Sequence, residues 1–244
     1  MIYFIGAGPG DPELLTLKAH KILRQADAVL YTGSLVPHAV LGWCKAEALV
    51  VDSQGMTYSE IFDFLQQHRH KIVARVHTGD PALYSTIAKQ IAYLQAHHIP
   101  YRVIPGITAA MGAAASLGIE YTIPGVSQGL LLTRIEGRTP NPERLEQILA
   151  CRNTSLVFYL SITLLETLRH TALRVGYAPK TPCWVVEKAT WETENIYQGT
   201  LENIHDQVAH IKGVALILLG DFLSQQESEP SRLYTQPPHG RSTS

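Results

Sequence analysis

Short apolar runs alternate with amphipathic stretches along the first half of the chain. The length of these runs and the turns that flank them predict β-strands. The runs cover residues 2–5, 28–31, 49–51, 72–76 and 101–104. The stretches between them place apolar residues at helical spacing, as in Ile87, Ile91 and Leu94. Strands that alternate with helices predict an α/β domain with a parallel sheet.

Several predicted strands end in turns that contain glycine and proline. The first strand runs into GAGPGDP at residues 6–12, and the fourth into TGDP at residues 78–81. Asp11 and Asp80 are predicted to cap the helices that follow, each with proline in the first helical position. A turn at residues 105–108 precedes a helix of small residues, which can pack against another helix or a flat ligand such as adenine. The Pro-Gly turn favours the ligand.

The pattern restarts after a linker predicted at residues 118–128. Strands of the second half are predicted at residues 130–134, 156–160, 183–188, 196–199 and 214–219. Short loops join several of them, which favours a mixed sheet. We therefore expect an α/β fold with two α/β domains, residues 1–117 and 129–223, and a ligand cleft between them. Residues 224–244 are rich in Ser, Gln, Glu and Pro and are predicted to form a flexible tail.

The composition describes a globular protein without a strong charge. The 244 residues are 45% hydrophobic and carry a formal net charge of -1, so nucleic acid is not expected as a partner. No stretch has the length of a membrane span. Cys44, Cys151 and Cys183 are widely spaced and form no disulfide or zinc motif, which is typical of a reducing, cytoplasmic compartment. The histidines lack a carboxylate or cysteine constellation, so no metal site is expected.

The first glycine-rich turn has some features of a dinucleotide-binding fingerprint. Its spacing is G-x-G-x-G, however, and Pro9 and Pro12 remove backbone donors that a pyrophosphate needs. Asp11 at the start of a helix also repels phosphate, and no acidic residue ends the second strand. An NAD(P)-dependent oxidoreductase therefore stays an alternative of a different class, and a non-catalytic binding module is a third possibility.

Four groups of residues occur together and in order along nearly the whole chain. They are GAGPGDP with LTLK (residues 6–12 and 15–18), HTGDP (77–81), PGITA (105–109) and EKAT (187–190). With them the chain resembles the tetrapyrrole (corrin/porphyrin) methyltransferases. YTGSLV (31–36), LTRIEGRTP (132–140) and KATW (188–191) resemble the members that act at C11 of a precorrin-4-type ring. The resemblance implies S-adenosylmethionine bound between two α/β domains, a homodimer, and methyl transfer to C11 in cobalamin biosynthesis.

The resemblance also implies cofactor-binding positions, most of them in the turns described above. They are Pro9, Thr78, Gly79, Asp80, Leu83, Thr108, Ala109, Leu160 and Ala189. For Asp80, contact with the cofactor and capping of its own helix both stay open. Related uroporphyrinogen-III methyltransferases carry an acidic residue, assigned as a base, directly after the tyrosine of the second strand. This chain has Thr32 there, so we predict no catalytic residue.

The expected substrate is anionic, since a precorrin ring carries acetate and propionate groups. A protein of net charge -1 attracts such a ring only with local cations. Arg134 and Arg138, in the polar loop after the first strand of the second domain, are the predicted substrate contacts, and Arg75 and His77 are weaker candidates. Precorrin-2, precorrin-3, uroporphyrinogen-III, a diphthamide precursor and RNA are alternative substrates, of which the near-neutral charge disfavours RNA.

Overall fold

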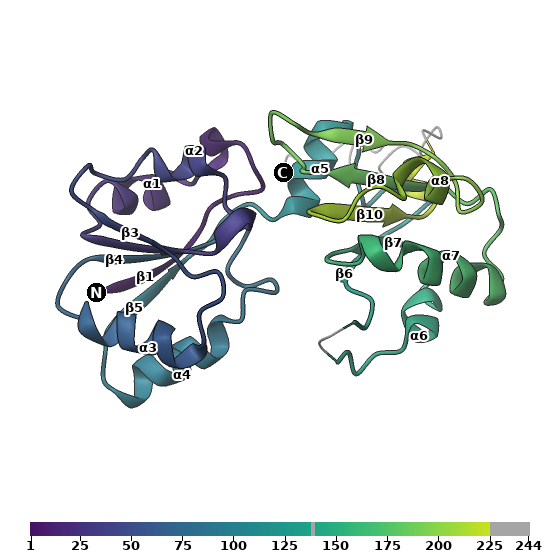
Figure 1. Ribbon diagram of the computed structural model, residues 1–244. Coiled ribbons are helices and arrows are strands. Elements are labelled where there is room, and N and C mark those ends of the chain that lie inside the picture. Colours follow the sequence, from purple (N-terminus) through teal and green to yellow (C-terminus); the bar gives the residue numbers. More distant parts are fainter. Residues whose placement is uncertain (138–139, 225–244) are drawn as a thin grey trace, which may run out of the picture. The chain divides into compact units, whose positions relative to one another are not determined.

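The computed structural model describes residues 1–137 and 140–224, which form two compact units (Figure 1). Unit 1 contains Met1–Ala113 and Lys188–Glu194, and unit 2 contains Ala114–Glu187 and the residues from Asn195 onward. The segment 188–194, predicted to lie in the C-terminal domain, is therefore part of unit 1, and the predicted linker 118–128 lies within unit 2. The predicted tail lies outside the described residues except for Ser224. None of the described helices is long and apolar enough to cross a membrane.

Unit 1 is built on a parallel sheet of five strands in the order β3-β2-β4-β1-β5. The strands are β1 (Ile2–Gly6), β2 (Ala28–Tyr31), β3 (Leu49–Asp52), β4 (Val73–His77) and β5 (Tyr101–Ile104). The helices are η1 (Pro12–Leu14), α1 (Leu17–Leu23), η2 (Gly33–Leu35), α2 (His38–Leu41), α3 (Tyr58–Gln67), α4 (Ile87–Ala96) and α5 (Ala109–Leu117). The predicted parallel α/β arrangement of the first half is confirmed.

Two hydrophobic clusters cover the two faces of this sheet. One contains apolar residues of α1 and of residues 36–40, packed on side chains such as Ile5 and Val76. The other contains apolar residues of α3 and α4, packed on Phe4 and Leu30. Successive residues of a strand point to opposite faces, which explains why neighbouring positions of β1 belong to different clusters.

Helix α3 begins with a cap at Thr57, whereas the helix start predicted at Asp80 differs in the structure. Thr57 caps α3 in a capping box, because its Oγ1 accepts from the Glu60 amide and the Glu60 carboxylate accepts from the Thr57 amide at 2.7 Å. The predicted helix directly after Asp80 is wrong, since α4 begins only at Ile87. Tyr84 and Thr86 have φ angles of 53° and 54°, which a right-handed helix does not accommodate.

We expect the substitution Thr57→Ala to lower the free energy of unfolding of unit 1 by about 1 kcal/mol, because it removes the cap of α3. Hydrogen exchange of the amides in the first turn of α3 measures this loss. Thr57→Ser keeps the hydroxyl and is expected to exchange like the unmodified chain. Equal protection in both variants would contradict the role of the cap.

Unit 2 contains a mixed sheet of five strands in the order β6-β7-β10-β8-β9. The strands are β6 (Gly129–Thr133), β7 (Thr154–Phe158), β8 (Cys183–Glu187), β9 (Asn195–Tyr197) and β10 (Ala215–Leu219). Strands β6 and β7 are parallel and the other pairs are antiparallel, which confirms the predicted mixed sheet. The helices are α6 (Leu145–Leu149), η3 (Ile162–Leu164), α7 (Leu165–Arg174), α8 (Ile204–Val208) and η4 (Asp221–Leu223).

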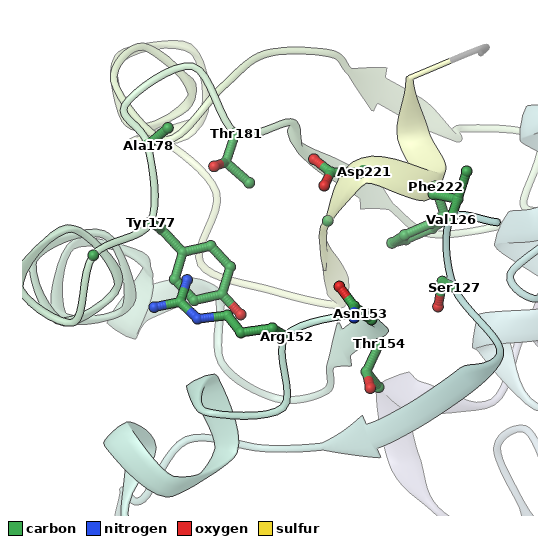
Figure 2. Close-up of a pocket in the computed structure, with 12 residues that line it drawn as sticks. Val126, Ser127, Arg152, Asn153, Thr154, Tyr177, Ala178, Thr181, Asp221 and Phe222 are labelled. Carbon is green, nitrogen blue, oxygen red and sulfur yellow. The ribbon is translucent and has the colours of Figure 1, made fainter.

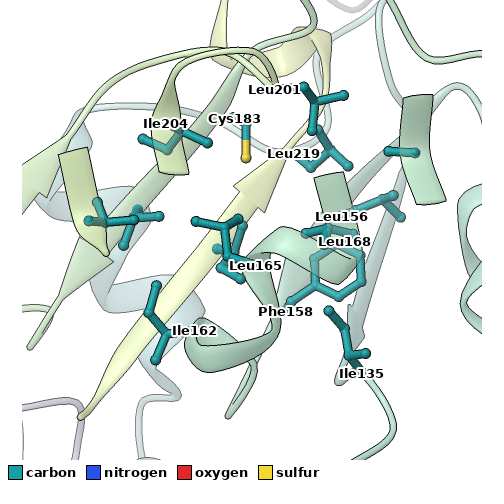
Figure 3. Close-up of a cluster of buried hydrophobic side chains, with 14 of the residues drawn as sticks. Ile135, Leu156, Phe158, Ile162, Leu165, Leu168, Cys183, Leu201, Ile204 and Leu219 are labelled. Carbon is teal, nitrogen blue, oxygen red and sulfur yellow. The ribbon is translucent and has the colours of Figure 1, made fainter. Parts of the chain in front are cut away.

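The core of unit 2 lies between this sheet and its helices (Figure 3). Phe158 and Leu219 from the sheet pack with Leu165 and Leu168 of α7 and with Ile204 of α8, and all five side chains are buried. This cluster anchors β7, the strand whose end leads to Leu160.

Candidate functional site

The ends of strands β1 and β4 of unit 1 are joined by backbone hydrogen bonds. Gly8 after β1 and Gly79 after β4 form a bridge, in which the Gly8 amide donates to the Gly79 carbonyl at 3.2 Å and the Gly79 amide donates to the Gly8 carbonyl at 2.8 Å. The Ala7 amide also donates to the His77 carbonyl at 2.7 Å. The carboxyl ends of parallel strands share one edge of a sheet, so these turns meet there.

This bridge lies at a topological switch point of the sheet. Strands β1 and β4 are neighbours, but β1 leads to α1 on one face and β4 leads to α4 on the other. Ligands of α/β sheets bind in the crevice that such a divergence opens at the carboxyl ends of the strands. The topology therefore supports the predicted site at Gly79 independently of any motif.

Glycines allow direct backbone contact between these turns. A Cβ atom on Gly106, which follows β5, would lie 2.2 Å from the Gly79 carbonyl oxygen, and one on Gly6 would lie 2.6 Å from Gly106 Cα. Gly79 itself has room for a Cβ atom, which would lie 3.6 Å from Thr108 Cα. Its requirement for glycine comes instead from a φ angle of 63°.

Asp80 connects the turn after β4 to the turn after β5. Its Oδ1 accepts from the Ala82 amide at 2.7 Å, and its Oδ2 accepts from the Gly106 amide at 2.8 Å. Both carboxylate oxygens therefore bind backbone amides of unit 1. The structure gives Asp80 a role in fixing the two turns, in place of the helix cap expected from the sequence.

The segment Lys188–Glu194 returns to unit 1 and packs against the first glycine-rich turn. Thr190 Oγ1 accepts from the Asp11 amide at 3.0 Å, and Trp191 Nε1 donates to the Pro9 carbonyl at 3.0 Å. A Cβ atom on Gly10 would lie 2.2 Å from Trp191 Cδ1 and 2.8 Å from the Ala189 carbonyl oxygen. The predicted positions Pro9 and Ala189, far apart in sequence, are thus brought together.

The small residues of α5 also serve this packing. A Cβ atom on Gly112 would lie 2.8 Å from Pro9 Cγ and 3.1 Å from Thr190 Cγ2. The sequence favoured a flat ligand against this helix. At Gly112 that expectation is wrong, because the close neighbour is the protein's own turn.

We expect the substitution Trp191→Phe to destabilise unit 1 by about 1 kcal/mol, because it leaves the Pro9 carbonyl without its donor while keeping an aromatic ring. Urea unfolding followed by circular dichroism measures the loss. Trp43→Phe is a matched control, since Trp43 is 41% exposed and its indole donates no hydrogen bond within the described residues. Equal stability of the two variants would contradict a structural role for the Trp191 hydrogen bond.

Left-handed backbone conformations mark the ends of β7 and β8. Leu160, two residues after β7, has a φ angle of 53° and is 65% exposed. Lys188 and Thr190 have φ angles of 50° and 65°. Such strained conformations occur preferentially at ligand sites. Of the predicted cofactor positions, Leu160 alone belongs to unit 2, and the others belong to unit 1.

Of the residues predicted to contact the substrate, the structure describes Arg134, Arg75 and His77. The Nη2 of Arg134 donates to the Pro140 carbonyl at 2.6 Å, and its own carbonyl accepts from Asn141 Nδ2 at 2.9 Å, so the start of the loop is fixed to its end. Arg138 lies outside the described residues. The prediction that His77 contacts the substrate as a cation is wrong. Burial and then the charge of Arg75 lower the pKa of His77 to about 3, so its ring is neutral at pH 7.

Unit 2 contains a pocket (Figure 2). It has a volume of about 150 Å³, and none of the predicted site residues lines it. Arg152, on its wall, is held 3.9 Å above the ring of Tyr177 and also donates to the Val175 carbonyl. Within the part of the chain that the structure describes, no group of three or more His, Cys, Asp or Glu side chains is arranged to hold a metal ion.

The fold and the site together define a class of protein. It is an α/β protein of two units, in which glycine-rich turns bond to each other at a switch point of the parallel sheet. The family model of the tetrapyrrole (corrin/porphyrin) methylases matches residues 1–205. The chain belongs to this family, which confirms the resemblance inferred from its motifs.

Several relatives are similar over nearly their full length. The chain is 38% identical to cobalt-precorrin-4 C(11)-methyltransferase of Methanocaldococcus jannaschii, over 96% of this chain and 92% of the relative. It is 41% identical to precorrin-4 C(11)-methyltransferase of Pseudomonas aeruginosa, over 96% and 94%.

Two solved structures are also similar. The first is cobalt precorrin-4 methyltransferase, a cobalamin biosynthetic enzyme, with a TM-score of 0.87, 38% identity, and coverage of 91% of this chain and 95% of the other. The second is uroporphyrin-III C-methyl transferase of Thermus thermophilus, complexed with S-adenyl homocysteine. Its TM-score is 0.76 at 29% identity, covering 91% of this chain and 98% of the other.

Proposed function

We propose that this protein is an S-adenosylmethionine-dependent methyltransferase that methylates C11 of precorrin-4 or cobalt-precorrin-4 in cobalamin biosynthesis. The observation that carries the proposal is the similarity to relatives named for this reaction, at 38% and 41% identity over almost the whole of both chains. The interlocked turns at the switch point of unit 1 supply the ligand site that such an enzyme needs.

The residues of unit 1 fit the cofactor. Glycine at position 79 leaves open a cradle that a Cβ atom would fill, and Thr108 Cα, the Ala109 amide nitrogen and the Ile107 carbonyl oxygen lie 3.6–3.8 Å from that point. A backbone donor and acceptor beside this glycine suit the adenosyl group. Thr78, Gly79, Thr108 and Ala109 would hold it, with Pro9 and Ala189 beside them.

The cofactor supplies a methyl group on a sulfonium, which leaves as a neutral thioether and so needs no acid from the protein. The task of the chain is to bind and orient. Bonds from Asp80 to two turns, and from Thr190 and Trp191 to a third, fix the turns before any ligand arrives. Pre-organised positioning of this kind lowers reaction barriers by about 7 to 11 kcal/mol in the best intramolecular models.

The substrate ring would meet the protein through its carboxylates. The chain has a net charge of -1, so local cations must bind them, and Arg134 and Arg138 are proposed for this role. The homodimer implied by the family resemblance and the cytoplasmic location inferred from the cysteine pattern are proposals as well, and light scattering of the purified protein tests the first.

The test is titration of the purified protein with S-adenosylhomocysteine and, separately, with NADH, followed by turnover. We expect micromolar binding of the first at one site per chain and no binding of the second. With methyl-labelled cofactor, precorrin-4 and cobalt-precorrin-4 are offered in parallel, and NMR locates the label at C11. Uroporphyrinogen-III, precorrin-2 and precorrin-3 serve as competing substrates, and faster methylation of any of them would overturn the proposal.

A further inference from the structure

A buried arginine lies near the carboxyl end of the first sheet. Arg75 of β4 is 4% exposed, and its Nε donates to Oε1 of Gln90 in α4 at 3.2 Å. Its Nη1 donates to the Leu30 carbonyl at 3.1 Å, to Ser53 Oγ at 3.1 Å and to Thr32 Oγ1 at 3.4 Å. Thr32 and Ser53 directly follow β2 and β3, so the guanidinium lies where these two strands end.

None of these acceptors is charged. Arg75 forms no ion pair with a carboxylate of the described residues, and its Nη2 has no acceptor among them. Asp52 raises the pKa of Arg75 from a distance, but its Oδ1 accepts from the amides of Gly33 and Gln54 at 2.9 Å and 2.8 Å. Buried charges in proteins are normally paired, because desolvation of an unpaired charge is costly.

The arginine stays charged at neutral pH. Burial lowers the pKa of Arg75 to about 10, still far above neutrality. His77, on the same strand, is 2% exposed and neutral at this pH. Within the described residues, His77 Nε2 and the amide nitrogen of Gln90 also have no hydrogen-bond partner. The polar groups of Arg75, His77 and Gln90 therefore contribute one positive charge and no negative charge.

The position of Arg75 is that of a second switch point. Strands β2 and β4 are neighbours, and the segment after β2 packs on the face of α1 while β4 leads to α4 on the opposite face. Ligands bind at such divergences. This one adjoins the switch point between β1 and β4 that contains Gly79.

We propose that the guanidinium of Arg75 attracts a carboxylate of the anionic substrate to this edge of unit 1, and that Thr32 preserves the charge by bonding to it without neutralising it. The inference rests on the proposed function and adds to it a pair of residues that select a polyanionic ring. A hydroxyl at position 32 accepts a hydrogen bond, whereas a carboxylate there would pair with Arg75. In a buried setting a charge acts more strongly than at the surface.

The test compares Thr32→Asp with Thr32→Asn, which has nearly the same shape but no charge. For Thr32→Asp we expect the affinity for cobalt-precorrin-4 to fall on the order of tenfold, and for Thr32→Asn by less than about threefold. Both variants should bind S-adenosylhomocysteine like the unmodified chain. Added salt should weaken ring binding less steeply in Thr32→Asp, because one attractive charge has been cancelled.

The outcomes separate this inference from the proposed function. Equal ring affinity and equal salt dependence in Thr32→Asp and Thr32→Asn would overturn the role of Arg75 alone. If the unmodified chain binds no tetrapyrrole, the proposed function fails and this inference fails with it. Should Thr32→Asp not fold, Ser53→Asp brings a carboxylate to the same Nη1 from β3 and is expected to weaken ring binding to a similar extent, with Ser53→Asn as its neutral control.

Discussion

Replacement of Gly106 by alanine is expected to lower the free energy of unfolding of unit 1 by at least about 3 kcal/mol. The new Cβ atom would lie 2.2 Å from the Gly79 carbonyl oxygen and 2.8 Å from Gly6 Cα. Both neighbours are backbone atoms of central strand ends, so neither can move aside like a flexible side chain. The turns after β1, β4 and β5 would have to separate, and the hydrogen bond from the Gly106 amide to the Asp80 carboxylate would be lost with them.

Urea unfolding followed by circular dichroism measures this loss, and hydrogen exchange in β1, β4 and β5 locates it. Gly213→Ala is the control, because a Cβ atom on Gly213 meets no atom within 4 Å and its φ angle is not positive. We expect that variant to stay within about 0.5 kcal/mol of the unmodified chain. An unchanged midpoint for Gly106→Ala would show that the three turns are not in direct backbone contact.

The second large effect concerns ligand affinity. Gly79→Val is expected to weaken binding of S-adenosylhomocysteine on the order of 100-fold in a protein that still folds. A β-branched residue does not adopt the φ angle of 63° found at Gly79, so the backbone between Thr78 and Asp80 would shift. The fold survives because the nearest atom to a Cβ here, Thr108 Cα, lies 3.6 Å away.

Gly55→Val separates backbone strain from a binding role. Gly55 has a φ angle of 83°, and a Cβ atom on it would meet no atom within 4 Å. Its substitution is expected to cost a similar amount of stability, about 1 to 3 kcal/mol, and to leave the affinity for S-adenosylhomocysteine unchanged. Normal affinity in a folded Gly79→Val variant would remove this turn from the cofactor site.

Much of unit 1 is predictable from local sequence, because its strands are continuous apolar runs with glycine-containing turns after them. The same patterns place Gly79 and Thr108 at one edge of the sheet. The start of α4 is not predictable this way, since Asp80 and Pro81 form a good helix start and the left-handed Tyr84 and Thr86 have no sequence signal. Helices α6 and α8 are not predictable from the sequence either, because five residues are too few for a periodic pattern.

Long-range contacts account for the rest. Nothing near Lys188 or Trp191 indicates that this segment returns to the first turn, because its bonds to Pro9 and Asp11 join residues that are 182 and 179 positions apart. The contact between Arg75 and Thr32 spans 43 positions and joins two strands that are not consecutive. Only the three-dimensional register shows that the arginine is buried and that its partner is a neutral hydroxyl.

The return of Lys188–Glu194 to unit 1 has a consequence for the order in which a nascent chain matures. All five strands of the first sheet are complete once Ile104 has been synthesised, but the hydrogen bonds to Pro9 and Asp11 in the first turn form only after Thr190 and Trp191 have been added. Strands β6, β7 and β8 therefore leave the ribosome before unit 1 can acquire its last segment. During translation the first glycine-rich turn lacks these two hydrogen bonds until most of the second sheet has been synthesised. We therefore expect the nascent chain to bind the ligand only late in its synthesis.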